Sequence, residues 1–192
     1  MVKSVKGTET EKNLLKAFAG ESQARNRYTF FASKAKKEGL EQISAFFLDT
    51  AANEKEHAER FFKFLDGGTV EITASFPAGV ISTTLENLKA AAAGEKEEWL
   101  EVYPDFAKVA QEEGFDVIAE TFRKIAVAEK HHEARYVQLA QNLENGEVFS
   151  RKSVIKWRCR NCGYVYESKT ALDLCPACLH PKAYMEELAE NF

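Results

Sequence analysis

The sequence predicts a mainly α-helical protein, in which a four-helix bundle with one long crossover is followed by a small metal-bound domain of strands and turns. Three observations support this prediction. Apolar residues recur with helical spacing in four stretches between residues 8 and 144, a helix-pair motif occurs twice there, and all four cysteines fall within the last 34 residues. We place the bundle in residues 1–148, and the linker and small domain in residues 149–192.

Two signals delimit the first helix pair. A helix is expected over about residues 8–37, opened by a capping box of Thr8 and Glu11. A glycine then interrupts the pattern, and a second helix is expected over about residues 40–65, where an Asp-Gly-Gly run is a strong stop. Residues 69–82 contain Phe-Pro-Ala-Gly and should form a long, partly extended crossover, as in bundles with one long connection.

The second helix pair has the same layout. Thr83 and Glu86 form a second capping box, and the helix that they open contains Pro104. We expect Pro104 to kink this third helix, because proline removes one backbone donor and crowds the preceding turn. The fourth helix is expected over about residues 115–144, with an Asn-Gly pair as its C-cap.

The two helix pairs are copies of one another. A shift of 75 positions aligns nine identical residues of the segment 38–60 with the segment 113–135, including Glu54 with Glu129 and His57 with His132. A shift of 74 positions aligns Gly20-Glu21 with Gly94-Glu95. Each copy therefore has a glutamate on its first helix and a Glu-x-x-His motif on its second.

These repeated residues point to a metal site inside the bundle. Residues three apart lie on one face of a helix, so each Glu-x-x-His motif places a carboxylate beside an imidazole. A single motif of this kind is usually a solvated glutamate near an unrelated histidine, but these motifs lie within apolar stripes. Burying an unpaired carboxylate costs several kcal/mol, and bound multivalent cations are the simplest way to neutralise five of them. The candidate ligands are Glu21, Glu54, His57, Glu95, Glu98, Glu129 and His132.

This set matches a known pattern for two metal ions in a bundle, namely one glutamate from each of two helices and Glu-x-x-His from each of the other two. Carboxylate and imidazole ligands suit iron or manganese, and a redox task would choose between them. Glu98 is an extra carboxylate, three residues beyond Glu95 on the same helix face, and is either a ligand or a group that contacts one.

The cysteines form two Cys-x-x-Cys motifs separated by twelve residues. Four thiolates in two such turns make a tetrahedral site for zinc or for one iron, and the absence of an export signal favours metal binding over disulfides. A domain of under about 40 residues usually needs such a staple to stay folded. The spacing does not choose the metal, and a structural zinc ribbon is the simplest interpretation of this segment alone. The four candidate ligands are Cys159, Cys162, Cys175 and Cys178.

Composition and charge exclude several other classes of protein. Of the 192 residues, 45% are hydrophobic and 29% are charged, which is ordinary for a globular protein. The net charge of −4 gives no electrostatic reason to bind nucleic acid or an anionic membrane surface. The first twelve residues lack the apolar core of a signal peptide, and no apolar run approaches the ~20 residues of a membrane span. We therefore expect a soluble cytoplasmic protein.

Taken together, these features resemble the rubrerythrin family over essentially the whole chain. The resemblance lies in the duplicated helix pairs, the extra carboxylate Glu98, and the Cys-x-x-Cys-Gly-Tyr and Cys-Pro-x-Cys motifs of a rubredoxin-like domain. It implies a ferritin-like bundle in which six ligands hold a di-iron centre and His57 joins one iron in the reduced state. It also implies a single iron held by the four cysteines. The six di-iron ligands implied are Glu21, Glu54, Glu95, Glu98, Glu129 and His132.

The resemblance further implies a peroxidase that reduces hydrogen peroxide to water. Its electrons would come from NADH through a separate reductase or a rubredoxin, and its usual assembly is a homodimer in which the small domain of one chain approaches the di-iron site of the other. An exchange of His57 for Glu98 would balance charge, because an anionic ligand suits a ferric pair better than a neutral imidazole does. Tyr28 and Tyr103 are candidates to hydrogen-bond ligand carboxylates, or else part of the apolar core.

Two other functions compete with this one. The bundle also suits a ferritin relative that oxidises or stores iron, although storage needs a hollow shell in which a 36-residue appendage has no evident place. The cysteine motifs also suit a non-enzymatic zinc-ribbon interaction protein whose bundle metals are structural. Native mass would separate the first alternative from a peroxidase, and the metal content would separate the second.

Overall fold

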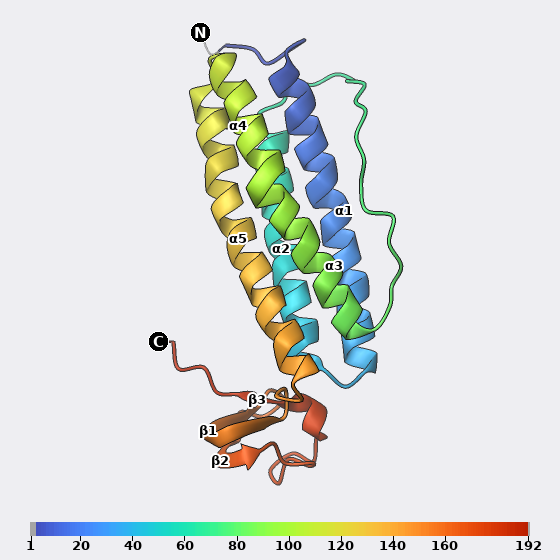
Figure 1. Ribbon diagram of the computed structural model, residues 1–192, viewed down its shortest axis with the longest axis vertical. Coiled ribbons are helices and arrows are strands. Elements are labelled where there is room, and N and C mark those ends of the chain that lie inside the picture. Colours follow the sequence, from blue (N-terminus) through green and yellow to red (C-terminus); the bar gives the residue numbers. More distant parts are fainter. Residues whose placement is uncertain (1–2, 192) are drawn as a thin grey trace.

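A long helical bundle and a small strand domain at one end of it make up the computed structural model, which describes residues 3–191 (Figure 1). The four rods of the bundle confirm the predicted ferritin-like, mainly α-helical architecture. Three rods are single helices, whereas the third is divided by a short π-helix. The helical elements are α1 (Glu9–Lys37), α2 (Glu41–Phe62), α3 (Thr84–Glu97), the π-helix Glu98–Val102, α4 (Tyr103–Glu112) and α5 (Asp116–Glu144).

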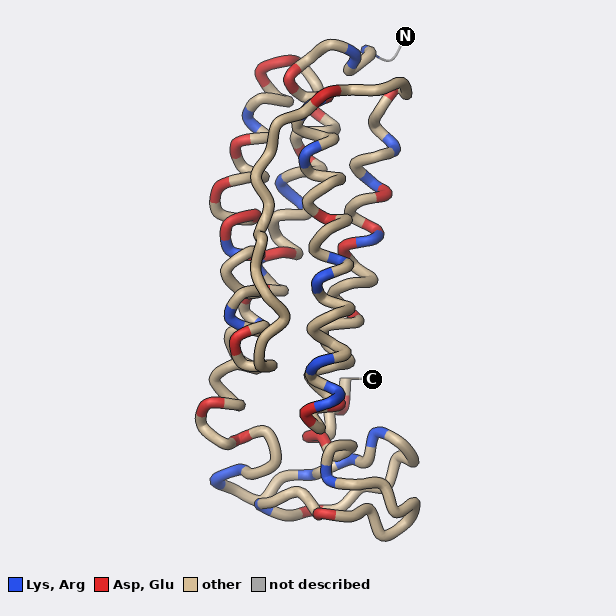
Figure 2. The backbone as a smooth tube through the Cα atoms, turned by 90° about the vertical axis from the view of Figure 1, so that its right-hand side faces the viewer, with Lys and Arg blue, Asp and Glu red and all other residues tan. Residues whose placement is uncertain are grey.

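The crossover between α2 and α3 runs along the outside of the bundle beside α1 and α3 (Figure 1). Residues 69–82 of this connection belong to no helix or strand, in agreement with the sequence-based expectation. Figure 2 shows charged residues along all the rods but few on the crossover, where Glu71 is the single charged residue between positions 69 and 82. This long connection carries the chain from the end of α2 back along the bundle to the start of α3, at the opposite end.

The two helix pairs are joined by reciprocal caps. The Glu38 carboxylate, at the end of α1, accepts a hydrogen bond from the Thr84 amide at the start of α3, with an oxygen–nitrogen distance of 3.0 Å. Its repeat equivalent, Glu113, accepts from the Thr10 amide at the start of α1 at 2.8 Å. Amides in the first turn of a helix have no partner within the helix, so each pair completes the first helix of the other.

Two local expectations need adjustment. The helix α2 ends at Phe62, three residues earlier than predicted. At the start of α1 the Thr8 hydroxyl accepts from the Glu11 amide at 3.1 Å, but the Glu11 carboxylate accepts from the Gly7 amide and not from that of Thr8. The capping box at the start of α3 is complete in both directions.

The third rod is divided by a π-helix, and this corrects the prediction of one helix kinked at Pro104. Over Glu98–Val102 the backbone widens, and the Tyr103 amide donates to the carbonyl oxygen of Glu98, five residues earlier. Pro104 lies in the first turn of α4. Proline has no amide hydrogen to donate to the preceding turn, and it lies directly after the wide π-turn, where the regular α-helical hydrogen-bond pattern is already interrupted.

This π-helix accounts for a one-residue mismatch in the repeat. The shift between copies is 74 positions for Glu21 and Glu95, which precede the π-helix, but 75 positions for Tyr28 and Tyr103. A π-turn contains one more residue than an α-turn. The second copy therefore absorbs an inserted residue at Glu98–Val102, and the residues on either side keep their repeat-related positions.

The core of the bundle consists of two apolar clusters with a polar layer between them. One cluster contains Tyr28, Phe47, Leu88 and Tyr136, and the other contains Leu14, Phe61, Tyr103 and Phe122. In α1 and α2, Glu21 and Glu54 lie between the residues that contribute to the two clusters. The predicted site residues therefore lie in a layer with an apolar cluster on each side.

The small domain is a three-stranded antiparallel sheet in which the first strand along the chain lies between the second and the third. Trp157 is fully buried in its core and donates from its indole nitrogen to the Ser168 carbonyl oxygen at 3.0 Å. Phe149 packs against both the bundle core and the small core. The strands are β1 (Ser150–Cys159), β2 (Val165–Thr170) and β3 (Met185–Glu187). Within residues 3–191, no helix combines the length and the apolar character that a membrane span requires.

Replacement of Gly39 by alanine should lower the free energy of unfolding by roughly 1 kcal/mol, because Gly39 has φ +75 and an L-residue is strained there. Its repeat equivalent Gly114, with φ +76, should respond similarly. Urea denaturation monitored by circular dichroism measures the change. Gly94→Ala is the matched control, because Gly94 is helical and an added methyl group meets only Arg27 Nη2 at 3.8 Å. Unchanged stability in both φ-positive variants would contradict this account.

Candidate metal centres

Four glutamates and two histidines converge between the apolar clusters of the bundle. Each glutamate is almost completely buried, with at most 1% of its surface exposed. Every rod contributes at least one of these side chains, so the bundle fold itself positions the site. The residues are Glu21 from α1, Glu54 and His57 from α2, Glu95 from α3, and Glu129 and His132 from α5.

The side chains form two overlapping groups, and within each group the candidate ligand atoms lie within 4.8 Å of one another. Glu54 and Glu129 belong to both groups. Each group thus offers three carboxylates and one imidazole, and two carboxylates are shared as a pair of bridging metal ligands would be. The first group is Glu21, Glu54, His57 and Glu129, and the second is Glu54, Glu95, Glu129 and His132.

Both histidines turn Nδ1 towards the carboxylates. His57 Nδ1 lies 2.8 Å from Glu129 Oε1 and 3.0 Å from Glu54 Oε2. His132 Nδ1 lies 2.7 Å from Glu129 Oε2, 3.3 Å from Glu54 Oε1 and 3.5 Å from Glu95 Oε2. Nδ1 is therefore the atom that each imidazole offers to a metal.

Burial and mutual charge shift the pKa values in opposite directions within the cluster. Burial and repulsion from other carboxylates raise the pKa of Glu21, and the same causes raise the pKa of Glu95 to about 8 against the pull of His132. Although burial acts the other way, hydrogen bonds with the histidines lower the pKa of Glu54 to about 2. Hydrogen bonds with glutamates, also against burial, raise the pKa of His57 to about 9 and that of His132 to about 12.

The residues present fit a pair of bound cations. Six buried atoms that face the cluster make no hydrogen bond of good geometry within the described chain, although several lie at ion-pair distance from one another, and five of the six are carboxylate oxygens. Buried polar atoms without a partner are costly, whereas a metal ion satisfies several at once. A donor set of carboxylates and imidazoles suits iron. The six atoms are Glu21 Oε2, Glu54 Oε1, Glu95 Oε2, Glu129 Oε1, Glu129 Oε2 and His132 Nδ1.

Two buried tyrosines hold carboxylates of the cluster across the bundle. Tyr28 donates from its hydroxyl to Glu95 Oε1 at 2.5 Å, and its repeat equivalent Tyr103 donates to Glu21 Oε1. Each tyrosine thus contacts the glutamate of the other helix pair. Burial raises the pKa of both hydroxyls well above the usual value, so both remain protonated donors.

Glu98 lies outside both groups, although the sequence places it among the candidate ligands. It lines a pocket of about 260 Å³ whose walls also include Gly20, Phe76 and Tyr103. A Cβ atom at Gly20 would lie 4.0 Å from Glu98 Oε1, so the carboxylate rests beside the residue that precedes Glu21. Burial and the neighbouring carboxylate of Glu95 raise the pKa of Glu98 well above its usual value.

Asn53 and Gly20 contact the site but are missing from the sequence-based candidates. Asn53 Oδ1 lies 3.2 Å from His132 Nε2, and Gly20 leaves room for Glu98. A single sequence carries a signal for Gly20, because it is repeated as Gly94 in the second copy. Asn53 has no such counterpart, since the equivalent position is Ala128.

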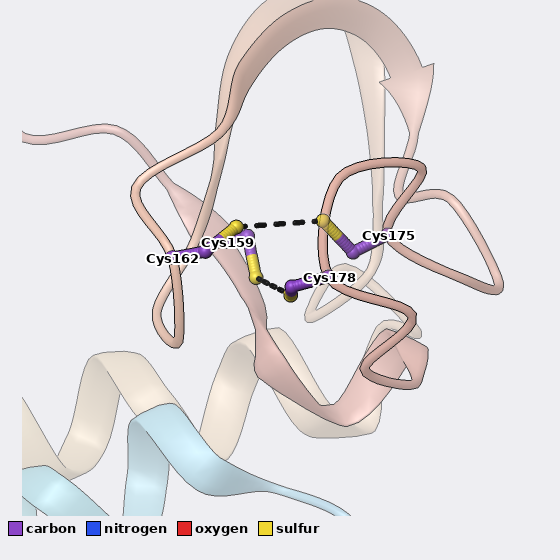
Figure 3. Close-up of side chains that lie close together, drawn as sticks. All are labelled: Cys159, Cys162, Cys175 and Cys178. Carbon is purple, nitrogen blue, oxygen red and sulfur yellow. Dashed lines mark hydrogen bonds between the residues drawn. The ribbon is translucent and has the colours of Figure 1, made fainter.

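The four cysteine side chains meet in the small domain (Figure 3). The Sγ atoms of Cys159 and Cys178 are 3.7 Å apart, and those of Cys162 and Cys175 are also 3.7 Å apart. A tetrahedral metal site with bonds of about 2.3 Å to sulfur has edges of about 3.8 Å. The thiols are therefore spaced for one tetrahedral ion, as the sequence predicts.

The two Cys-x-x-Cys turns are closed by residues in the left-handed region. Gly163 has φ +79 and Leu179 has φ +58, and their amides donate at 2.9 Å to the carbonyl oxygens of Cys159 and Cys175. Beyond the second turn, the amide of His180 lowers the pKa of Cys178 to about 6, so this side chain is ready to bind metal as a thiolate.

Fold and sites together define a ferritin-like di-iron protein with an attached rubredoxin-like domain. Comparison with known proteins agrees. The family model named Rubrerythrin matches residues 12–140, and the one described as Rubrerythrin, rubredoxin-like domain matches residues 157–186. The chain belongs to the rubrerythrin family, a family of oxidoreductases, and carries a carboxylate and histidine di-iron site and a four-cysteine rubredoxin-like site. The predicted family and cofactors are thereby confirmed.

Named relatives and a solved structure support this assignment. The chain is 63% identical to a rubrerythrin of Porphyromonas gingivalis over all of this chain and 96% of the relative. It is 58% identical to a rubrerythrin of Nitratidesulfovibrio vulgaris over the full length of both chains. A structure of nigerythrin in a mixed-valence state superposes with a TM-score of 0.63 at 29% identity, covering 98% of this chain and 91% of that chain.

Metal binding to the bundle should release at least two protons at pH 7. The pKa values of about 9 for His57 and about 12 for His132 mean that both imidazoles are protonated in the metal-free protein, and each must lose a proton to bind a metal. Affinity should accordingly rise with pH between 7 and 9. Anaerobic calorimetric titration with ferrous iron measures the release, in buffers of different ionisation enthalpy and with chains whose cysteine site is already filled, because thiols also release protons when they bind metal. A heat of binding that is independent of the buffer would contradict the protonated state.

Proposed function

We propose that this protein reduces hydrogen peroxide to water at its di-iron centre, and that the rubredoxin-like site supplies the electrons. The observation that carries the proposal is the position of Glu98, a carboxylate held outside the centre at the wall of a pocket while His57 occupies the centre. A site that only held metal would not need an additional carboxylate beside a pocket. A centre whose charge changes during turnover would need one, because the carboxylate can compensate the added positive charge.

The proposed ligands follow from the two groups. Glu21, Glu54, Glu95, Glu129 and His132 would hold the ions in both oxidation states, whereas His57 would bind in the reduced state and Glu98 would replace it in the oxidised state. The bound iron pair supplies the two electrons in the balance H₂O₂ + 2H⁺ + 2e⁻ → 2H₂O. Oxidation adds positive charge to the centre, and the anionic Glu98 side chain then interacts more favourably than a neutral imidazole.

The pocket beside Glu98 is the proposed route for peroxide. Gly20 has no side chain, so the pocket reaches the carboxylate of Glu98 without obstruction. Tyr28 and Tyr103 keep Glu95 and Glu21 oriented while the ligands on the pocket side exchange. In this proposal Glu98 and His57 are the catalytic residues, and the two tyrosines are positioning residues.

The four-cysteine site is the proposed entry point for electrons, delivered one at a time from NADH through a separate reductase or a rubredoxin. The small domain lies at the end of the bundle near the turn at Gly39, where an added Cβ would be 3.7 Å from Ala183 Cβ (Figure 1). Glu54 is 15 residues further along the chain, or about 22 Å of helix. Electron transfer weakens steeply with distance, so we propose a homodimer in which each small domain serves the partner's centre.

A fully reduced chain holds three electrons, two in the iron pair and one at the four-thiolate site, so about 1.5 molecules of peroxide per chain should reoxidise it and the visible absorption of the ferric four-thiolate site should return. Glu54→Ala removes a shared carboxylate of the bundle but leaves the cysteines intact. Before reduction, this variant should therefore keep the colour of its ferric thiolate site. After reduction, its reoxidation by peroxide should be at least 100-fold slower than that of the unmodified chain. Anaerobic stopped-flow absorption with stoichiometric peroxide measures both. A colourless protein with zinc at the cysteines, or a Glu54→Ala variant as fast as the unmodified chain, would exclude the proposed function.

Transfer between subunits predicts complementation of two inactive variants. Glu54→Ala disables the di-iron centre and Cys162→Ser disables the electron entry site, so each homodimer should turn over at background. Mixed dimers should regain up to about half of the unmodified rate, because the intact small domain of one chain serves the intact centre of the other. Steady-state peroxide consumption after subunit exchange measures this, with sedimentation to confirm the dimer. Mixed dimers at background would favour transfer within one chain.

A further inference from the structure

The two histidines of the metal centre are repeat equivalents, but their second ring nitrogens have different surroundings. His132 Nε2 lies 3.2 Å from the side-chain oxygen of Asn53, which reaches across from α2 to α5. The repeat equivalent of Asn53 is Ala128 on α5. Alanine has no polar side-chain atom, so position 128 cannot provide His57 with the same hydrogen bond.

This difference matters because both histidines offer Nδ1 to the metal. A neutral imidazole that binds metal through Nδ1 carries its proton on Nε2, and that proton needs an acceptor. An acceptor fixes the orientation of the ring and raises its basicity, and its loss typically weakens metal binding 10- to 100-fold. The exposed fractions agree, since the His132 side chain is 5% exposed and that of His57 is 15% exposed.

The alternative ligand lies on the same side of the centre as the histidine without an anchor. Glu98 rests against Gly20, next to Glu21, and Glu21 belongs to the group that contains His57. In the first copy of the repeat the equivalents of Glu98 are Gln23 at a shift of 75 and Ala24 at a shift of 74, and neither is acidic. One half of the centre thus has an imidazole whose Nε2 contacts an asparagine, and the other half has an imidazole without an equivalent asparagine and a spare carboxylate.

We infer that Asn53 is a positioning residue that makes His132 a permanent ligand, and that alanine at position 128 leaves His57 free to exchange with Glu98. This inference rests on the proposed function, because it takes the di-iron centre and the ligand exchange as given. It adds the reason why one of two equivalent histidines exchanges and the other does not. The two histidines differ in the hydrogen bond made by Nε2, the ring nitrogen that does not face the metal site.

Metal affinity tests the role of Asn53 without any need for turnover. Asn53→Leu has a similar volume but no acceptor, so one of the two bundle sites should bind Zn²⁺ 10- to 100-fold more weakly. Asn53→Asp keeps an acceptor oxygen and should restore the affinity. Anaerobic calorimetric titration of Zn²⁺ into chains whose cysteine site is already filled gives both constants. Asn53→Ala serves as a second variant without an acceptor if Asn53→Leu does not fold.

Ligand exchange tests the role of position 128. Ala128→Asn should give His57 an anchor, so the oxidised variant should keep two imidazoles on the iron pair where the unmodified protein keeps one. X-ray absorption of the oxidised and reduced forms, or crystal structures of both, counts the imidazole ligands. The exchange of a carboxylate for an imidazole should then be lost in this variant while its dimer and its thiolate absorption stay unchanged.

The outcomes separate this inference from the proposed function. If the unmodified bundle binds no pair of ions, the proposed function fails. If it binds two ions and Asn53→Leu binds them equally tightly, or Asn53→Asp does not restore a lost site, the inference about Asn53 is wrong. If oxidised Ala128→Asn still releases His57, the inference about position 128 is wrong, and the di-iron assignment stands.

Discussion

The burial of four carboxylates in the middle of an apolar bundle is the constraint on which the rest of this structure depends. Clusters of aromatic and aliphatic side chains pack on both sides of the acidic layer, so water cannot solvate it. Such a layer is stable only beside compensating positive charge. Metal ions provide that charge in the loaded protein, and the protons of His57 and His132 provide part of it otherwise. The glutamate and histidine of each Glu-x-x-His motif therefore stabilise one another in the metal-free protein and bind metal in the loaded protein.

Duplication of the helix pair explains how one chain builds a two-metal centre. Each copy supplies an acid on its first helix and an acid and an imidazole on its second, and the contacts that hold them cross between the copies. Tyr28 holds Glu95, and Tyr103 holds Glu21. The caps donated by glutamates at the turns cross in the same way. Neither half has a complete set of partners alone, so the halves must form one cooperative unit.

The sequence predicts what is local or repeated, and fails where a side chain depends on its neighbours in space. Periodicity and caps located the four rods to within a few residues, and the repeat identified the clustered glutamates and histidines. The outward position of Glu98 follows from the π-helix and the pocket; the change of repeat shift from 74 to 75 positions marks an inserted residue there but not the shape that the backbone takes. Asn53 is one polar residue among many until the fold brings it to His132. The crossed tyrosine contacts likewise depend on packing between helices.

The π-helix at Glu98–Val102 makes the two metal positions of the centre different from one another. Two identical helix pairs would create a site with twofold symmetry, in which neither ion differs from the other. One added residue, accommodated as a wide turn, leaves both flanking stretches in register and gives the second half an acidic group with no twin. Removing one residue from this turn would restore a continuous α-helix, but the difference between Asn53 and Ala128 would remain. The difference between the two metal positions therefore depends on one inserted residue as well as on the types of residue around them.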